Sequence, residues 1–260
     1  MIVRFLSKPV LIIFTFVALL ALLLPQNFVI AAPGPTSNLL GKAVEIKASD
    51  IFPEKTFENG ALYSTAIYVT NPGQHPLGFQ VLQAWIDGNL LVLPTNAIYD
   101  VKASPKVANA QQKQEMVESQ LNGALAALNF IKKIPKYPKP TWSESDVKIV
   151  MKKVGGGSAG LAFALALIAK SADPQLIGTR KIAATGTISQ DGKVGPIGGV
   201  DLKVLSAHRA GATIFLMPKS NCSGLSKYPK GMQIFAVNNL SEAVHALAGA
   251  NPSSFSCAKR

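Results

Sequence analysis

The stretch GGGSAGLAFALALIAK at residues 155–170 constrains the fold of this chain more than any other segment. After Ser158 its residues are apolar on almost every side of a helix, and a helix of that kind has to be buried in a protein core. The three glycines before Ser158 let the backbone turn tightly and approach other groups closely. The sequence therefore predicts a buried helix, from Ser158 to about Ala172, that follows a glycine turn.

Strands and helices alternate on both sides of this segment. Residues 107–133 place apolar side chains at helical spacing and predict the longest helix. A last strand and a helix capped by Asn239 or Ser241 follow near the C-terminus. This order predicts a mixed α+β fold in which helices pack on mixed sheets. The other strands are predicted at 61–69, 89–94, 147–154, 180–189 and 212–218, with a helix at 200–210 and a short helix or extended segment at 78–86.

The N-terminal segment has the pattern of an export signal or a membrane anchor. Arg4 and Lys8 precede an unbroken apolar run at 10–24, and positive charge before such a run is typical of both. If the run extends to Ala32, it has the roughly 20 residues that a membrane-spanning helix needs. We therefore expect a single-pass protein of the cytoplasmic membrane, held by residues 10–32 with the rest on the extracytoplasmic side, or a secreted protein after cleavage near Ala32.

The charge and the cysteines fit that expectation. With 26 Lys and Arg against 14 Asp and Glu, the chain carries a net charge of +12. A basic exported domain can bind anionic headgroups or cell-wall polymers, and an envelope-binding protein is one interpretation. No nucleic-acid-binding module is visible, so we expect no nucleic-acid partner. Outside the cytoplasm Cys222 and Cys257 would form a disulfide or remain two free thiols.

The glycine-rich stretch does not fit a nucleotide site. A phosphate-binding loop needs a lysine after its last glycine, but Leu161 follows Gly160. Gly155, Gly157 and Gly160 match a dinucleotide fingerprint, but the acidic residue that should follow would be Asp173, which is predicted to lie in a loop rather than at a strand end. We therefore expect no nucleotide cofactor, and no metal.

Two interpretations of Ser158 remain from the residues alone. It is either a helix cap or a nucleophile whose alkoxide is stabilised by the N–H groups at a helix start. A nucleophile needs a base, and no histidine is placed with an orienting carboxylate. Lys203, flanked by apolar Leu202 and Val204, would serve if burial lowered its pKa; otherwise it is an ordinary surface lysine. The three histidines of the chain are His75, His208 and His245.

A longer pattern resembles the proteolytic domain of Lon proteases. The sequence GGGSAGLAFALAL at 155–167 is followed by TGTISQDGKVGPIGGVDLKVLSAHRAGATIFLMP at 185–218. That family has a G-x-SAG serine, a TG-x-I strand and a P-I-GG turn that leads into the helix with the lysine base. The resemblance implies that Ser158 is the nucleophile, Lys203 its base and Thr185 a residue that holds the lysine. It also implies an oxyanion hole of backbone amides from Gly157, Ser158 and Ala159.

The resemblance covers residues 55–248, and the chain looks most similar to membrane-anchored Lon-like proteases that carry a PDZ domain. Only the proline-rich linker 134–144 stands where a PDZ domain would lie, and Gly155 stands where the family usually has an acidic residue. The organisation expected is a signal anchor or signal peptide, a spacer, a Lon-like proteolytic domain and a C-terminal tail, at 1–32, 33–54, 55–248 and 249–260.

The function implied is that of an ATP-independent serine endopeptidase acting on unfolded or flexible proteins or peptides. Resemblance to ring-forming enzymes also implies a homo-oligomer. A catalytically silent Lon-like domain that binds proteins at the membrane is the alternative. Labelling of Ser158 by a serine-reactive reagent would separate the two.

Overall fold

The computed structural model describes residues 7–47, 52–100, 103–151, 154–249 and 255–257 of the 260-residue chain. The chain forms two compact units, and each is described by itself. The smaller unit comprises Met1–Ala32 and Val69–Ala108, and the larger one comprises Pro33–Tyr68 and Asn109–Arg260.

The larger unit is built on a sheet of mostly parallel strands. From one edge its order is β10 (Gln233–Val237), β9 (Ile214–Pro218), β6 (Lys181–Ala184), β3 (Ala61–Val69) and β1 (Phe28–Asn38). The pairs β10–β9, β9–β6 and β6–β3 are all parallel. Such strands are covered on both faces, which explains why β9 reads IFLMP with every residue buried.

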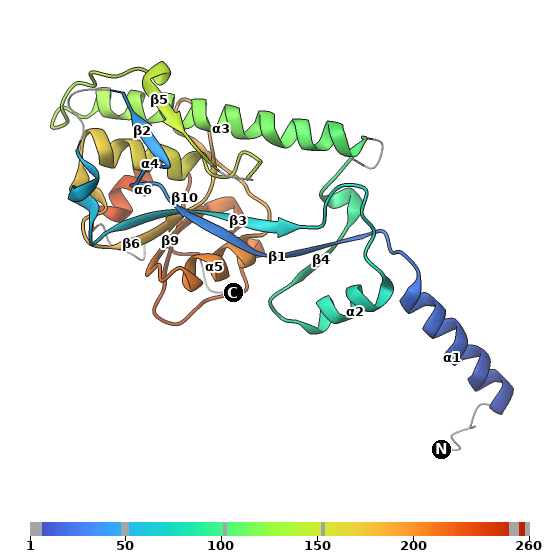
Figure 1. Cartoon of the computed structure of the whole chain (residues 1–260). Helices are drawn as coiled ribbons and strands as arrows, with labels where there is room; N and C mark the ends of the chain where they lie inside the picture. The colour runs from blue at the N-terminus through green and yellow to red at the C-terminus, as the bar shows by residue number, and fades with distance from the viewer. Residues whose placement is uncertain (1–6, 48–51, 101–102, 152–153, 250–254, 258–260) are drawn as a thin grey trace. The chain divides into compact units, whose positions relative to one another are not determined.

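Helices cover both faces of this sheet (Figure 1). Alternate residues of each strand face opposite ways. Leu216 of β9 therefore packs in a cluster with α3 (Pro105–Lys133), α4 (Gly160–Ser171) and α6 (Leu240–Leu247), whereas Phe215 packs against α5 (Val200–Arg209). The mixed α+β fold predicted from the sequence is confirmed.

The helix α4 is the centre of the larger core. Every residue from Gly160 to Ser171 is buried, as the apolar sequence requires. The helix begins two residues after Ser158, so Ser158 lies in the turn before it. Earlier in the sequence, β5 (Val147–Ile149) pairs with β2 (Val44–Ile46) in a separate small sheet.

The predicted strand at 180–189 is divided in two. After β6 the chain leaves the main sheet, and β7 (Thr187–Ile188) pairs with β8 (Val194–Gly195) as a short hairpin. The predicted strand at 147–154 is observed only as β5, and residues 152–153 lie outside the described part. The remaining short elements are the 3₁₀ turns η1 (Glu54–Phe57), η3 (Glu144–Asp146), η4 (Pro174–Leu176) and η5 (Lys219–Gly224).

The smaller unit contains α1 (Lys8–Leu23), the first residues of β1, α2 (Gly78–Ile86), β4 (Leu91–Pro94) and η2 (Thr95–Ala97). Phe28–Ala31 of β1 pair antiparallel with Leu91–Pro94 of β4. The segment 78–86, for which the sequence allowed a helix or an extended chain, forms the helix α2.

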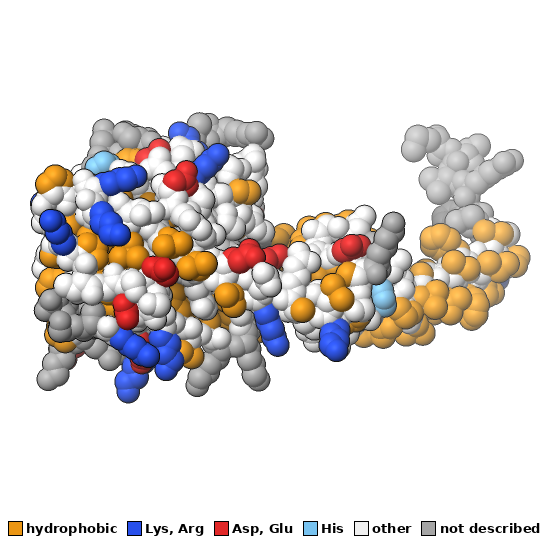
Figure 2. All heavy atoms as spheres, turned by 90° about the horizontal axis from the view of Figure 1, so that it is seen from above, with side chains coloured by type: hydrophobic (Ala, Val, Ile, Leu, Met, Phe, Trp, Pro, Cys, Tyr) orange, Lys and Arg blue, Asp and Glu red, His pale blue; other side chains and the backbone are white. Residues whose placement is uncertain are grey.

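The prediction of a membrane-spanning segment within residues 10–32 has to be corrected. The helix α1 has 16 residues, about 24 Å at 1.5 Å per residue, whereas a bilayer core is about 30 Å thick. The chain then turns at Pro25 and becomes strand from Phe28, so the rest of the apolar run cannot lengthen the helix. Among the described residues, none of the helices has both the length and the apolar composition for crossing a bilayer. The predicted single-pass location in the cytoplasmic membrane is therefore wrong. Figure 2 shows the apolar side chains of α1 in orange.

Candidate functional site

Ser158 and Lys203 lie in direct contact although 45 positions separate them in the sequence. The Nζ atom of Lys203 donates a hydrogen bond to Oγ of Ser158 at 2.7 Å. Ser158 occupies the turn before α4, where Gly156 adopts a positive φ of 85° that favours glycine. Lys203 lies in the middle of α5, and only 3% of its surface is exposed. The two helices therefore bring a half-buried hydroxyl and a buried amine together.

Backbone hydrogen bonds attach the Ser158 turn to the end of β6. The N–H of Gly186 donates to the carbonyl of Ser158 at 2.8 Å, and the N–H of Leu161 donates to the carbonyl of Gly186 at 3.1 Å. This pair of bonds holds the turn beside the residue that follows β6. That residue is Thr185, which is fully buried.

Thr185 links the other two side chains. Its Oγ1 donates to the carbonyl oxygen of Ser158 at 3.1 Å and accepts from Nζ of Lys203 at 3.3 Å. Because the hydroxyl proton is used on the Ser158 carbonyl, the lone pairs of Oγ1 remain for the amine. Thr185 therefore fixes the direction from which the amine approaches Ser158.

Burial changes the chemistry of the Lys203 amine. The pKa of Lys203 falls from 10.5 to about 7, and the cause is desolvation, which penalises the ammonium form. The neighbouring Leu202 and Val204 are almost completely buried, and no carboxylate forms an ion pair with Nζ in the described part of the chain. At neutral pH a large fraction of the amine is therefore unprotonated and able to accept a proton.

Two contacts position the start of α5, and sequence reasoning missed both. The side chain of Asn221 accepts a hydrogen bond from the N–H of Ile197 at 3.0 Å and donates to its carbonyl at 2.8 Å. The carboxylate of Asp201 accepts from the backbone N–H groups of Ser226 and Lys227. The turn before the lysine helix is thus fixed by η5 and the residues after it. A lone asparagine in a loop carries no sequence signal for such a bond.

The two cysteines are joined beside this loop. Cys222 in η5 forms a disulfide with Cys257, with an S–S distance of 2.03 Å. The bond closes a loop with a sequence separation of 35 residues and attaches the C-terminal tail to the segment that holds Ile197 through Asn221.

A second feature of the turn is the backbone N–H groups of Gly157, Ser158 and Ala159. None of the three is paired with an acceptor in the region that the structure describes, although the N–H groups of Gly156 and Leu161 on either side are. Unpaired donors at a helix start can stabilise an oxyanion. The three residues predicted as an oxyanion hole therefore have donors available for it.

The local structure explains why position 155 is a glycine. A Cβ atom there would lie 3.0 Å from Cβ of Gln112, a residue of α3. An acidic side chain at this position would therefore displace α3 or the turn.

The histidines are not part of the site, because within the described residues none of them hydrogen-bonds to Ser158: His75 belongs to the smaller unit, His208 to the last turn of α5 and His245 to α6.

The chain matches the model of the Lon protease (S16) C-terminal proteolytic domain over residues 86–248, more than half of its length. It belongs to this family. The match includes the glycine turn, Ser158, Thr185 and Lys203. Family membership supports a serine-type protease function for the Lon-type domain and agrees with the resemblance noted from the sequence.

The curated relatives that this chain matches include several Lon proteases. That of Roseiflexus castenholzii is 45% identical over 75 residues, covering 29% of this chain and 9% of the relative. Lon protease 1 of Bacillus subtilis is 36% identical over 99 residues, covering 36% of this chain and 12% of the relative. The Lon protease of Buchnera aphidicola subsp. Schizaphis graminum is 28% identical over 178 residues, covering 65% of this chain and 22% of the relative. The chain thus spans less than a quarter of the length of each of these relatives.

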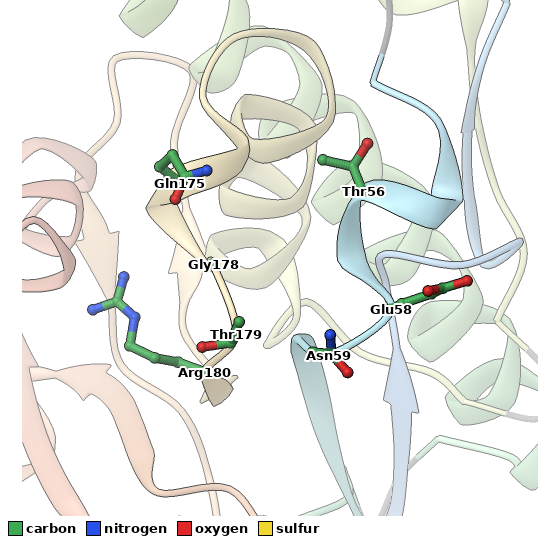
Figure 3. A pocket seen from close by; sticks show the side chains of 7 residues that line it. All are labelled: Thr56, Glu58, Asn59, Gln175, Gly178, Thr179 and Arg180. Carbon is green, nitrogen blue, oxygen red and sulfur yellow. The ribbon is translucent and has the colours of Figure 1, made fainter.

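A cavity of about 450 Å³ lies at the opposite end of β6 from Thr185. Figure 3 shows its lining, with Arg180 on one side and Thr56, Glu58 and Asn59 on the other. The guanidinium of Arg180 donates hydrogen bonds to the carbonyls of Ile177, Leu176 and Leu247. It therefore links the end of α6 to the segment before β6. We assign this cavity no part in the Lon-type site.

Proposed function

We propose that this chain is a serine endopeptidase in which Ser158 is the nucleophile and Lys203 its general base. The observation that carries the proposal is the 2.7 Å hydrogen bond between a serine hydroxyl and a lysine amine whose burial lowers its pKa to about 7. A general base works best when its pKa lies near the operating pH. An exposed lysine would be charged at neutral pH and could not take the proton.

The reaction proceeds through an acyl-enzyme. Neutral Lys203 takes the proton of Ser158 as Oγ attacks the carbonyl carbon of the scissile peptide bond. The oxyanion that forms accepts hydrogen bonds from the N–H groups of Gly157, Ser158 and Ala159. The Lys203 ammonium then gives its proton to the leaving amine, and the C–N bond breaks. A water molecule next loses a proton to the amine of Lys203 and attacks the ester carbonyl carbon. As the ester C–O bond breaks, the Lys203 ammonium returns that proton to Oγ, which releases the acid and restores Ser158.

Thr185 orients the base in this reaction. Its oxygen accepts one N–H of Lys203, and the amine is thereby directed toward Ser158. In triad proteases a carboxylate orients a histidine, and here a neutral hydroxyl has the corresponding task. A carboxylate would raise the pKa of the lysine and keep it charged, whereas a hydroxyl leaves the effect of burial intact.

We further propose that cleavage needs no ATP and that the substrates are unfolded or flexible proteins. Every proton transfer in this mechanism passes through Lys203, so the chemistry itself requires no nucleotide. An extended peptide is needed to bring a backbone carbonyl to Ser158, which lies half-buried between packed helices. A homo-oligomer belongs to the same proposal and is tested by light scattering of the full chain.

The test is cleavage of casein by the full chain, beside Ser158→Ala, Lys203→Ala and, as a matched control, Lys132→Ala, which changes an exposed lysine in the last turn of α3. We expect kcat/KM of the wild type to rise about tenfold per pH unit below pH 7 and to level off above it, because only the neutral amine is active. The two site variants should lose at least about 10³-fold, and Lys132→Ala should match the wild type.

Two other outcomes would reject the proposal. Cleavage that persists unchanged in both site variants would assign the activity to another site. Binding of casein without cleavage, together with no labelling of Ser158 by a fluorophosphonate, would instead indicate a catalytically silent binding domain.

A further inference from the structure

One buried serine of α3 contacts the turn that holds Ser158. Ser119 is only 4% exposed, and its Oγ donates a hydrogen bond to the carbonyl oxygen of Gly157 at 2.9 Å, across 38 positions of sequence. Within the described residues, its hydroxyl forms no hydrogen bond with Lys203 or Thr185. The mechanism described above makes no use of it.

This contact differs from those of two other buried helical serines. The Oγ of Ser171 donates to the carbonyl of Leu167 at 2.7 Å, and that of Ser206 donates to Leu202 at 3.0 Å, so both bond to the preceding turn of their own helix. That is the usual arrangement for a serine within a helix. Ser119 directs its hydroxyl to another segment of the chain instead.

The same face of α3 holds the turn at further points. The carbonyl of Gln112 accepts a hydrogen bond from the N–H of Gly156 at 2.8 Å. Gly123 packs so closely on the start of α4 that a Cβ atom would lie 3.1 Å from the carbonyl oxygen of Gly160. Positions 112, 119 and 123 are seven and four residues apart, which places them on one face of a helix. This face of α3 is therefore a platform for the glycine turn.

The bond from Ser119 determines where the N–H of Ser158 points. The described peptide bonds are trans, and in a planar trans peptide the C=O of one residue and the N–H of the next point in opposite directions. When the Gly157 carbonyl points at Ser119 in α3, the Ser158 N–H must point away from α3. Three glycines precede Ser158, so the backbone alone would not hold this peptide plane in one orientation.

We propose that Ser119 is a positioning residue that locks the Gly157–Ser158 peptide plane and thereby directs the Ser158 N–H into the oxyanion hole. The inference rests on the proposed serine endopeptidase function. Ser119 does not touch the substrate or the reacting atoms. It acts through the peptide whose N–H does.

The experiment compares Ser119→Ala with Ser171→Ala in the full chain. Both variants remove a buried hydroxyl that donates to a backbone carbonyl, but Ser171 lies at the far end of α4 from the turn. The measurements are kcat and KM on casein-derived peptides, the pH midpoint of kcat/KM, inhibition by a peptide aldehyde and thermal unfolding. The hemiacetal that an aldehyde forms with Ser158 places an oxygen in the oxyanion hole.

For Ser119→Ala we expect kcat to fall about 10- to 100-fold with KM changed less than about twofold, because the donor acts on the transition state rather than on the bound substrate. Aldehyde inhibition should weaken by a similar factor. The pH midpoint should stay near 7, because Lys203 is untouched, and Ser171→Ala should keep the wild-type kcat. Ser119→Cys fills the same space with a weaker donor and should give an intermediate kcat, which keeps the test available if the alanine variant folds poorly.

The outcomes separate this inference from the proposed function. If the wild type neither cleaves peptides nor is labelled at Ser158 by a fluorophosphonate, the proposed function and this inference both fail. If the wild type is active but Ser119→Ala has the same kcat and aldehyde inhibition as Ser171→Ala, only the role of Ser119 is overturned. A shift of the pH midpoint that accounts for the loss in kcat would also overturn it, because the base would then be the group disturbed.

Discussion

Replacement of Lys203 by methionine tests the buried amine without any substrate. Methionine has a similar length and volume, so Lys203→Met keeps the packing around Leu202 and Val204 and removes the ionisable group. If burial lowers the pKa of Lys203, the wild type must bind its proton more weakly when folded than when unfolded. That difference makes the free energy of unfolding depend on pH in a way that the variant lacks.

The size and sign of the effect follow from the pKa. The amine titrates at about 7 in the folded chain and at 10.5 when unshifted, a gap of about 3.5 units, which corresponds to about 5 kcal/mol at about 1.4 kcal/mol per unit. Between these values the unfolded chain holds the proton and the folded chain does not. The stability of the wild type therefore rises with pH through this window and is independent of this group below it.

The assay is urea unfolding of the wild type and Lys203→Met at pH values from 5.5 to 10, with Lys132→Met as the control for an exposed lysine. The fluorescence of Trp142, which is buried in the larger unit, reports unfolding there, in a Trp85→Phe background that removes the exposed tryptophan of the smaller unit. The wild-type free energy of unfolding minus that of Lys203→Met should rise by about 4 kcal/mol from pH 6 to pH 10 and stay constant below pH 6.

A difference that does not change between pH 6 and pH 10 would refute the reasoning, because it would show that the amine titrates alike in the folded and unfolded chain. A difference that falls as pH rises would mean that a partner holds the lysine charged. Either result would remove the physical basis for Lys203 as a base at neutral pH.

Three further predictions concern the surroundings of the site. Reduction of the Cys222–Cys257 disulfide should lower the free energy of unfolding by about 4 kcal/mol, given its separation of 35 residues, as measured by urea unfolding with and without dithiothreitol. Gly160→Ala should destabilise by about 1–3 kcal/mol in the same assay, because its Cβ would lie 2.7 Å from a side-chain carbon of β7. Gly198→Ala, where no described atom lies within 4 Å of the new Cβ, should change stability by less than about 1 kcal/mol. Thr185→Val should lower kcat about 10- to 100-fold and Thr185→Ser should retain most of it, since only the serine keeps the oxygen that accepts from the amine; equal kcat in the two variants would contradict this role.

The local sequence pattern was sufficient to predict those elements whose burial follows from their own residues. An apolar sequence on every side predicts the buried α4, and β9 reads as a strand because a strand covered on both faces has to be apolar throughout. Asn239 was one of two candidate caps, and it is the residue whose side chain accepts from the N–H of Glu242. The candidate pair Ser158 and Lys203 also came from motif order.

The N-terminal segment shows where local pattern fails. The apolar run predicts one long helix, but α1 ends at Leu23, and the residues from Phe28 form a strand because they pair with β4, about 60 positions further along the chain. Hydrophobicity alone does not distinguish a spanning helix from a shorter helix followed by a buried strand. The partner strand decides, and it is a tertiary feature.

The sequence by itself determined the buried helix, the mixed α+β class and the family, because each depends on residues that are close in the chain or on their order. The tertiary structure decided which side chains lie together in the candidate site and what holds them. The pKa of Lys203 depends on side chains packed around it, and the contacts of Ser119 with Gly157 and of Asn221 with Ile197 join residues 38 and 24 positions apart. A serine in a helix or an asparagine in a loop has many possible partners, and only the packing of one element against another selects the one it binds.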